Sequence, residues 1–351
     1  MDRSRNVSLD ILRIIAAFSV VVLHVCARYI SINPVNSFDF AAANFYDSIN
    51  RFGVPVFVMI SGALFLSKAR DVDTKRLWLH NIIRILVVYL VWGFFYYFFQ
   101  SAYLWNFNLW NAGIVRTIKG IVYGSDHLWF LPMIAGLYAL IPMLRVWTSK
   151  ASRQNVEYVI ILFFFFNILL GSLDLLLDSS LATKIVGMAQ IKELSGYLGY
   201  FILGYYLTNF EVYKRIRFAI YASVPVDIVL NFLISEKFSL DKGAYHPGIY
   251  DSFGIFTFAE VTALFMAVIY INNGKKIPDK FAGFIKNVSA DTFGVYLMHV
   301  MILDYVFYEG YFSYLYPSIA FVLPVSSVLF IVSCLISAGL RRIPVIGRYL
   351  A

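Results

Sequence analysis

Arg13 and His24 are the residues whose types and spacing best suit chemistry, because eleven positions separate them within one apolar segment. On a helix this separation is about 1100° of rotation, so the side chains differ by only about 20° around the axis and by roughly 16 Å along it. Asp10 lies one turn before Arg13 and can pair with it. An imidazole can take a proton from a hydroxyl or accept an acyl group, and a guanidinium binds phosphate through two hydrogen bonds.

Both residues also have a simpler interpretation. A lone arginine near the end of an apolar segment usually extends to the lipid headgroups, and a lone histidine usually bonds a neighbouring carbonyl. Arg84 favours the chemical interpretation, since it lies about as deep in the third apolar segment as Arg13 does in the first. Two arginines at one depth indicate a phosphate site on the side of the N-terminus.

Three further polar residues, His127, Glu260 and His299, lie within or at the start of apolar segments. A charged group at membrane depth costs about 2.5–3.5 kcal/mol on insertion scales, so each such residue requires a reason. Glu260 and His299 are deep enough to face an aqueous cavity, although for each alone structural hydrogen bonding is the commoner role. The two cysteines have no metal-ligand spacing, and no metal site is expected.

The elements that must position these residues are helices within a membrane. The chain has 351 residues, of which 60% are hydrophobic and only 14% charged, against about 25% charged in globular domains. This composition excludes a cytosolic enzyme, a nucleic-acid binder and a disordered chain, and continuous apolar runs disfavour a β-barrel. We predict an all-α polytopic membrane protein of about ten transmembrane helices, near residues 9–30, 52–67, 79–104, 127–147, 156–178, 195–210, 216–235, 252–272, 290–308 and 316–340.

The distribution of lysine and arginine predicts the orientation. With the N-terminus inside, the inner segments hold 19 of these residues and the outer segments 8, so we expect both termini in the cytoplasm and the protein in the cell membrane. The net charge of +8 therefore reflects inner loops rather than a nucleic-acid partner. No linker or change of composition divides residues 1–351, and a single membrane domain is expected.

The one long outer loop, residues 105–126, carries apolar residues at helical spacing. This pattern predicts an interfacial or re-entrant helix. Aromatic residues precede it at Tyr103, Trp105, Phe107 and Trp110. An ordinary aromatic belt is the favoured interpretation, and a stacking platform for a sugar acceptor is the alternative.

Four ordered motifs indicate a family. Arg13 and His24 form an R-x10-H pattern, and the later motifs are Gly53-Val54-Pro55-Val56-Phe57 running into Ser61-Gly62, His127-Leu128-Trp129-Phe130, and Thr292-Phe293-Gly294-Val295-Tyr296-Leu297-Met298-His299. The chain resembles the acyltransferase 3 family of integral membrane acyltransferases from about residue 9 to 300. The order and spacing are similar to the branch that O-acetylates surface polysaccharides, such as enterobacterial common antigen.

The resemblance implies transfer of an acyl group, usually acetyl from acetyl-CoA inside the cell, to a hydroxyl of an outer polysaccharide or lipid-linked glycan. Arg13 and His24 would be the essential pair, and Arg84 would belong to the basic motif of the third helix. The first arginine of that motif is replaced by Asn81, so Lys75, Arg76 or His80 would complete the donor site. A supporting polar pocket would comprise Asp10, His127, Trp129, Glu260, Tyr296 and His299.

Two other classes of function remain compatible with the sequence. A transporter, flippase or exporter of a polysaccharide or lipid-linked sugar would also use arginine, glutamate and histidine inside the membrane. A structural component of a polymer-synthesis complex would not need Arg13 and His24 on one helix face.

Overall fold

The computed structural model describes residues 6–67, 72–101, 113–123, 125–177, 180, 181, 184, 196–248, 251–272, 277–344 and 347. Within these ranges all regular structure is helical. The helices are α1 (Val7–Ile32), α2 (Phe38–Ile49), α3 (Gly53–Phe65), α4 (Thr74–Leu77), η1 (Trp78–Ile82), α5 (Ile83–Phe99), α6 (Ile114–Tyr123), η4 (Asp126–Trp129), α7 (Phe130–Lys150), α8 (Arg153–Phe163), η5 (Phe164–Leu169), α9 (Leu170–Leu176), α11 (Tyr197–Asn209), α12 (Lys214–Lys242), α13 (Ile255–Asn272), α14 (Asp279–Tyr308), η7 (Tyr311–Tyr314) and α15 (Ser318–Leu340).

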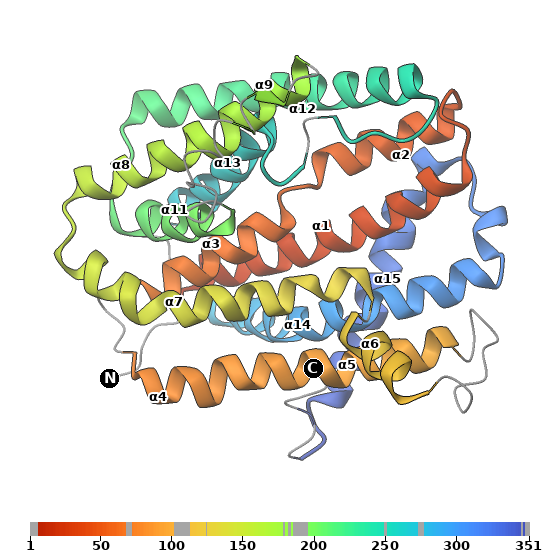
Figure 1. The fold of residues 1–351 in the computed structure, drawn as a ribbon, viewed down its shortest axis with the longest axis horizontal. Coiled ribbons are helices and arrows are strands. Elements are labelled where there is room, and N and C mark those ends of the chain that lie inside the picture. The colour runs from red at the N-terminus through yellow and green to blue at the C-terminus, as the bar shows by residue number, and fades with distance from the viewer. Residues whose placement is uncertain are drawn as a thin grey trace.

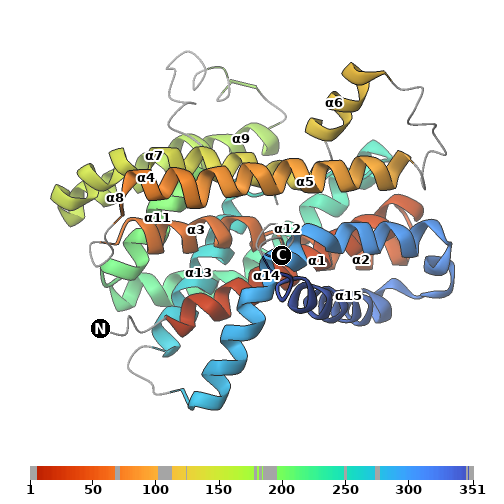
Figure 2. The same cartoon turned by 90° about the horizontal axis from the view of Figure 1, so that it is seen from below.

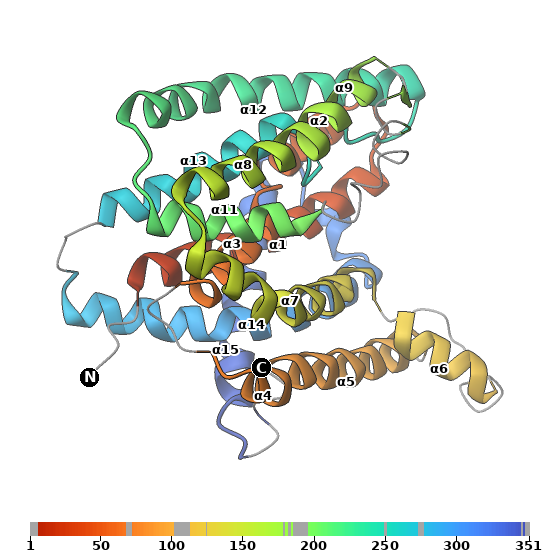
Figure 3. The same ribbon diagram turned by 60° about the vertical axis from the view of Figure 1, so that its left-hand side comes forward.

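The predicted all-α polytopic membrane architecture is confirmed. Among the described residues, nine helices or runs of consecutive helices are long and apolar enough to cross a membrane. The one predicted segment outside this set, residues 195–210, corresponds to α11, which at 13 residues is shorter than a full crossing. Figure 1 shows the bundle lengthwise, with α5 along one edge and α12 along the opposite edge, an arrangement that Figure 3 repeats. The cytoplasmic position of the two termini stays a prediction.

Two predicted boundaries are wrong. The segment expected over 52–67 is a broken crossing of α2 and α3 that begins at Phe38, and polar residues such as Asp39, Asn44 and Asp47 concealed its first half. The helix expected over 290–308 begins at Asp279 as α14. Lys280 and Lys286 lie in its first turns, and their charge made the hydropathy pattern place its start too late. In both cases tertiary partners or an exposed helix end accommodate polar residues that a hydropathy reading assigns to loops.

Helix α1 is the central element of the bundle. Its N-terminus is capped by Asn6, whose side chain accepts a hydrogen bond from the backbone N–H of Ser8 at 3.0 Å. Buried residues recur on most of its faces because α2, α3, α13, α14 and α15 all pack against it. A helix surrounded in this way has little rotational freedom, so its neighbours set the directions of its buried side chains.

The short helices α3 and α11 cross through two glycines. A Cβ atom on Gly62 would lie 1.8 Å from the carbonyl oxygen of Phe201, and one on Gly204 would lie 2.0 Å from the carbonyl oxygen of Met59. Both distances are far inside van der Waals contact, so only glycine allows this backbone approach. Small residues at such crossings are the usual means by which membrane helices pack closely.

Helix α6 forms within the predicted outer loop and rests on α5. A Cβ on Gly93 of α5 would lie 2.3 Å from the carbonyl oxygen of Ile121, and one on Gly120 would meet the ring of Tyr97. Figure 2 shows α6 extending away from the bundle beside one end of α5. The aromatic residues at 103–110 lie outside the described residues, and the position of α6 relative to a membrane surface stays a prediction.

Candidate active site

A cavity of about 470 Å³ lies between α1, α3, η1, α5, α7, α14 and the end of α15. Its lining combines basic groups with aromatic and aliphatic side chains: Arg13, Phe57, Ile60, Ser61, His80, Asn81, Arg84, Ile85, Phe130, Leu131, Ile134, Tyr138, Ser289, Ala290, Thr292, Phe293, Tyr296 and Arg341. Such a volume lies within the range of small-molecule sites.

Two buried carboxylates hold two of the arginines in place. Asp10 is 2% exposed and accepts hydrogen bonds from Arg13 Nη1 at 3.0 Å and from Ser289 Oγ at 2.7 Å. Asp291 pairs with Arg341 Nε at 2.7 Å, and its Oδ1 also accepts from Ser337 at 3.1 Å. The pairing of Asp10 with Arg13 is therefore confirmed.

Arg341, at the end of the last helix, adds a third arginine to the cavity wall. In the sequence it is one of the 19 inner-segment cations, and nothing there indicates a role in a site. Both carboxylates fix the planar guanidinium groups at the cavity wall, an arrangement that suits a phosphate.

A π-helical turn places the basic motif of the third crossing. Residues Trp78–Ile82 form this turn between α4 and α5, and His80, Asn81 and Arg84 all line the cavity. Single π turns inside helices are frequent at functional sites. The guanidinium of Arg84 lies 5.9 Å from the ring centroid of Phe293, which orients it over the cavity wall.

Lys75 and Arg76, expected to bind the donor, do not line this cavity. They are exposed in the first turn of α4, where their backbone N–H groups donate to the carboxylate of the cap residue Asp73. Among the described residues, the sequence-predicted cations that reach the cavity are Arg13 and Arg84, together with His80.

Three histidines lie next to the part of the cavity that Tyr296 lines. Tyr296 lines the cavity, and its ring centroid lies 5.6 Å from that of His127. The rings of His24 and His299 are 5.0 Å apart, those of His24 and His127 are 6.0 Å apart, and those of His127 and His299 are 5.5 Å apart. Helices α1, η4 and α14 thus bring together three of the predicted residues that are far apart in the chain. These three histidines do not line the cavity themselves, and Tyr296 links the cavity to His127.

Hydrogen bonds define the tautomer of His299. Its Nδ1 lies 2.9 Å from the carbonyl oxygens of both Val295 and Tyr296, which can only accept, so Nδ1 carries the hydrogen. Nε2 therefore presents its lone pair, and this atom is buried with no partner among the described residues. His127 is similar: Nδ1 lies 2.9 Å from Ser125 Oγ, and its buried Nε2 has no described partner. Buried ring nitrogens of this kind are poised to exchange protons or to meet a ligand.

Two tyrosines fix the helices around the histidines. Tyr96 of α5 donates to the carbonyl of Leu297 at 2.9 Å and accepts from the backbone N–H of Met301 at 3.1 Å. Tyr296 of α14 donates to the carbonyl of His127 at 2.6 Å. These bonds tie α5, α14 and η4 together around the three histidines.

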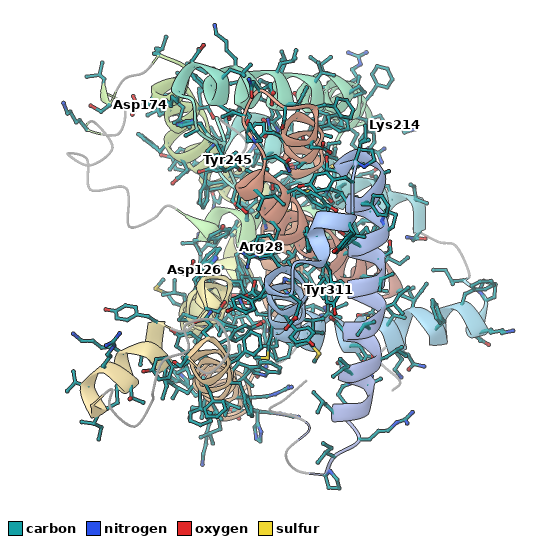
Figure 4. All side chains as sticks on the ribbon, turned by 90° about the vertical axis from the view of Figure 1, so that its right-hand side faces the viewer. Arg28, Asp126, Asp174, Lys214, Tyr245 and Tyr311 are labelled. Carbon is teal, nitrogen blue, oxygen red and sulfur yellow. The ribbon has the colours of Figure 1, made fainter. Side chains whose placement is uncertain are left out.

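On the side away from the cavity, an ion pair closes the histidine cluster. Arg28 lies one turn beyond His24 on α1 and pairs with Asp304 of α14, while its guanidinium carbon lies 5.3 Å from the ring centroid of Phe307. Figure 4 looks along the bundle from this end, with Arg28 near the middle of the view. The cluster therefore has a basic cavity on one side and a salt-bridged polar layer on the other.

Two residues predicted for the polar pocket lie elsewhere. Glu260 of α13 bonds Asn231 of α12 and lines a separate cavity, because α13 packs on the α12 side of α1. Trp129 is 46% exposed and its ring packs 5.6 Å from Tyr197. No group of histidine, cysteine, aspartate and glutamate side chains within the described part of the chain has the geometry of a metal site.

Comparison with known proteins gives one result. A family model described as an acyltransferase domain matches residues 6–338, which is nearly the whole chain. No curated protein and no solved structure matches.

Proposed function

The chain belongs to the acyltransferase 3 family, and on that basis we propose that it moves an acetyl group from acetyl-CoA to a hydroxyl of an extracytoplasmic or lipid-linked polysaccharide. The observation that carries the proposal is a cavity lined by three arginines and by Tyr296, whose ring lies 5.6 Å from that of His127 in the three-histidine cluster. A membrane acyltransferase needs both features, because a charged donor enters from one side of the membrane and reacts at some depth.

The donor fits the cavity in one direction. Its phosphates would lie against Arg13, Arg84 and Arg341, whose planar groups match phosphate oxygens. Its narrow arm would pass the aromatic wall of Phe57, Phe130 and Phe293 toward Tyr296. Arg13 and His24 lie roughly 16 Å apart along α1, so the reactive thioester would arrive beside the imidazoles at the end of a long, thin arm.

The proposed reaction balances without any further reactant. A neutral imidazole nitrogen of His24 takes the proton of the acceptor hydroxyl, the oxygen attacks the thioester carbonyl, and the carbon–sulfur bond breaks. The imidazolium then returns its proton to the leaving thiolate, so that the products are an ester and a free thiol. In the alternative route the imidazole of His24 attacks the thioester carbonyl, the carbon–sulfur bond breaks, and the thiol leaves with the ring proton. The acceptor oxygen then attacks the acyl-imidazole, and the released imidazole takes the hydroxyl proton.

His299 and His127 would assist His24. Their rings lie 5.0 and 6.0 Å from His24, and each has a buried Nε2 without a described partner. Because Nδ1 of His299 is held by two carbonyls, the Nε2 atom can accept a proton from the neighbouring imidazole and release it again. Proton transfer between the imidazoles would carry the proton of the acceptor hydroxyl to the leaving thiolate.

The test uses membrane vesicles from cells that make the chain and from matched cells that lack it. After incubation with [14C]acetyl-CoA, label is expected in the glycan fraction only where the chain is present. An exporter or flippase would instead change the amount of glycan outside the cell and incorporate no label. Absence of label in every glycan and glycolipid fraction would contradict the proposal.

A further inference from the structure

A second cavity, of about 340 Å³, lies on the opposite side of α1 and shares no lining residue with the first. It is formed where the junction of α2 and α3 meets α12 and α13. Its lining is apolar except for a tyrosine and one carboxyl group: Ile49, Phe52, Tyr221, Val224, Ile228, Glu260, Ala263, Leu264 and Ala267. This surface, here named the α12–α13 groove, plays no part in the acyl transfer proposed above.

Glu260 is a buried group with an unused oxygen. It is 5% exposed, and its Oε1 accepts from Asn231 Nδ2 at 3.1 Å. Oε2 has no hydrogen-bond partner among the described residues, and the same holds for Oδ1 of Asn231 and Oγ1 of Thr257, one turn away. Unsatisfied polar atoms buried among helices cost free energy unless a ligand completes them. An amide oxygen accepts, and a carboxyl group can accept or, when protonated, donate, so the missing partner is a small polar group that can do both, such as a hydroxyl.

The position of the groove points to a lipid. Helix α12 lies at one edge of the bundle (Figures 1 and 3) and exposes Val226, Val229 and Leu233. The remaining side of α12 is polar at every fourth residue, and this stripe faces α13 and α2 through Asn231 and Ser235. A ligand that enters beside α12 therefore comes from the bilayer.

The groove also has a direction. Glu260 lies five residues, or about 7–8 Å, from the start of α13, which the charge bias places at the outer side. The apolar part continues inward along Ala263 and Ala267, whose small side chains leave room for a chain. A polar end beside Glu260 with an apolar tail running inward is the orientation of an outer-leaflet lipid.

Charge narrows the class of lipid. No lysine or arginine lines the groove, and a phosphate placed there would face the oxygens of Glu260 and Asn231. A phosphate needs cationic or N–H partners, whereas a free hydroxyl both donates and accepts and needs no cation beside it. We infer that the α12–α13 groove binds one chain of a neutral outer-leaflet lipid whose hydroxyl forms a hydrogen bond with Glu260. The volume suits one chain and not an entire lipid.

The test is photo-crosslinking of the intact protein in phosphatidylcholine liposomes. The probes are a diacylglycerol and a phosphatidic acid that carry the same diazirine-labelled acyl chain. Diacylglycerol is expected to label peptides containing Val224–Ile228 or Ala263–Ala267, in preference to phosphatidic acid by about fivefold, the equivalent of one ordinary hydrogen bond. Equal labelling by both probes would overturn the inference.

Two matched pairs of variants test the residues. Ala267→Leu fills the groove and should remove labelling there, whereas Ala219→Leu adds the same volume at an exposed position of α12 and should not. Glu260→Leu removes the group that bonds the hydroxyl and should abolish the preference for diacylglycerol, whereas Glu236→Leu, beside Asn44, should retain it. Unchanged labelling in Ala267→Leu, in protein that stays monodisperse, would refute the site even where the glutamate variants fail to fold.

Discussion

Replacing Arg341 tests whether the cavity binds the donor through specific contacts or through general positive charge. Arg341 lines the cavity and is held by Asp291, whereas the adjacent Arg342 does not line it, although both are exposed. Arg341→Ala and Arg342→Ala remove the same charge from the same helix end. Only the first is expected to weaken acetyl-CoA binding strongly.

The structure sets the size of the effect. A hydrogen bond to a charged group contributes about 1.5–3 kcal/mol, and about 1.36 kcal/mol corresponds to a factor of ten. The side chain of Arg341 is 35% exposed, so solvent screens part of the interaction and the lower half of this range applies. The Kd for acetyl-CoA should therefore rise about 10- to 45-fold in Arg341→Ala and by less than about twofold in Arg342→Ala.

The assay is titration calorimetry of the detergent-solubilised protein, with the thermal midpoint recorded in parallel. Removing Arg341 leaves Asp291 with Ser337 as a donor, and the double variant Arg341→Ala/Asp291→Asn removes the unpaired carboxylate. This double variant should bind as weakly as Arg341→Ala while it regains thermal stability. Equal weakening in the Arg341 and Arg342 variants would refute the specific site, as would full affinity in a stable Arg341→Ala.

Three further predictions concern the transfer step, the packing and the topology. His24→Ala should retain acetyl-CoA binding and lose about 10²- to 10⁴-fold in transfer rate, measured with labelled donor. His246→Ala lies outside the histidine cluster and should keep the full rate. Substantial transfer without His24 would rule out its catalytic role. Gly62→Leu should destabilise the protein by more than the usual cost of overpacking, about 1–3 kcal/mol, and this should appear as a lower thermal midpoint. Gly136→Ala should leave the midpoint unchanged, because a Cβ at Gly136 meets nothing within 4 Å. An unchanged midpoint for Gly62→Leu would contradict the α3–α11 crossing. A cysteine introduced at Lys286 should react with a membrane-impermeant reagent only in inside-out vesicles, and labelling of intact cells would reverse the proposed orientation.

Hydropathy was sufficient to identify the class of protein and most of the crossings. Water is excluded from the bilayer core, so a spanning segment must be apolar over most of its length and helical throughout. The same reasoning failed for α2 and for the start of α14, where polar residues lie in helices. Asn44, for example, is fully buried because Glu236 and Ser235 of α12 bond its side chain. Such compensation between helices cannot be read from one segment.

The candidate site divides in a similar way. The helical period alone placed Asp10, Arg13 and His24 on related faces of one helix, and the pairing of Asp10 with Arg13 follows from that spacing. The distances between His24, His127 and His299 depend on how three separate elements pack, and a list of polar residues in apolar segments does not contain them.

The tertiary structure also decided which charged residues share a site. Glu260, like His299, is a polar residue deep within an apolar segment of the sequence. It nevertheless lies on the opposite side of α1, because α13 packs against α12. Arg341 looks like any other inner-loop cation in the sequence, and it reaches the cavity because Asp291 of α14 holds it there. The sequence therefore determined the membrane environment, the helices and the contacts within one helix, because these depend on local periodicity and transfer free energy. Contacts between helices depend on the packing of the whole bundle, and only the folded structure determined them.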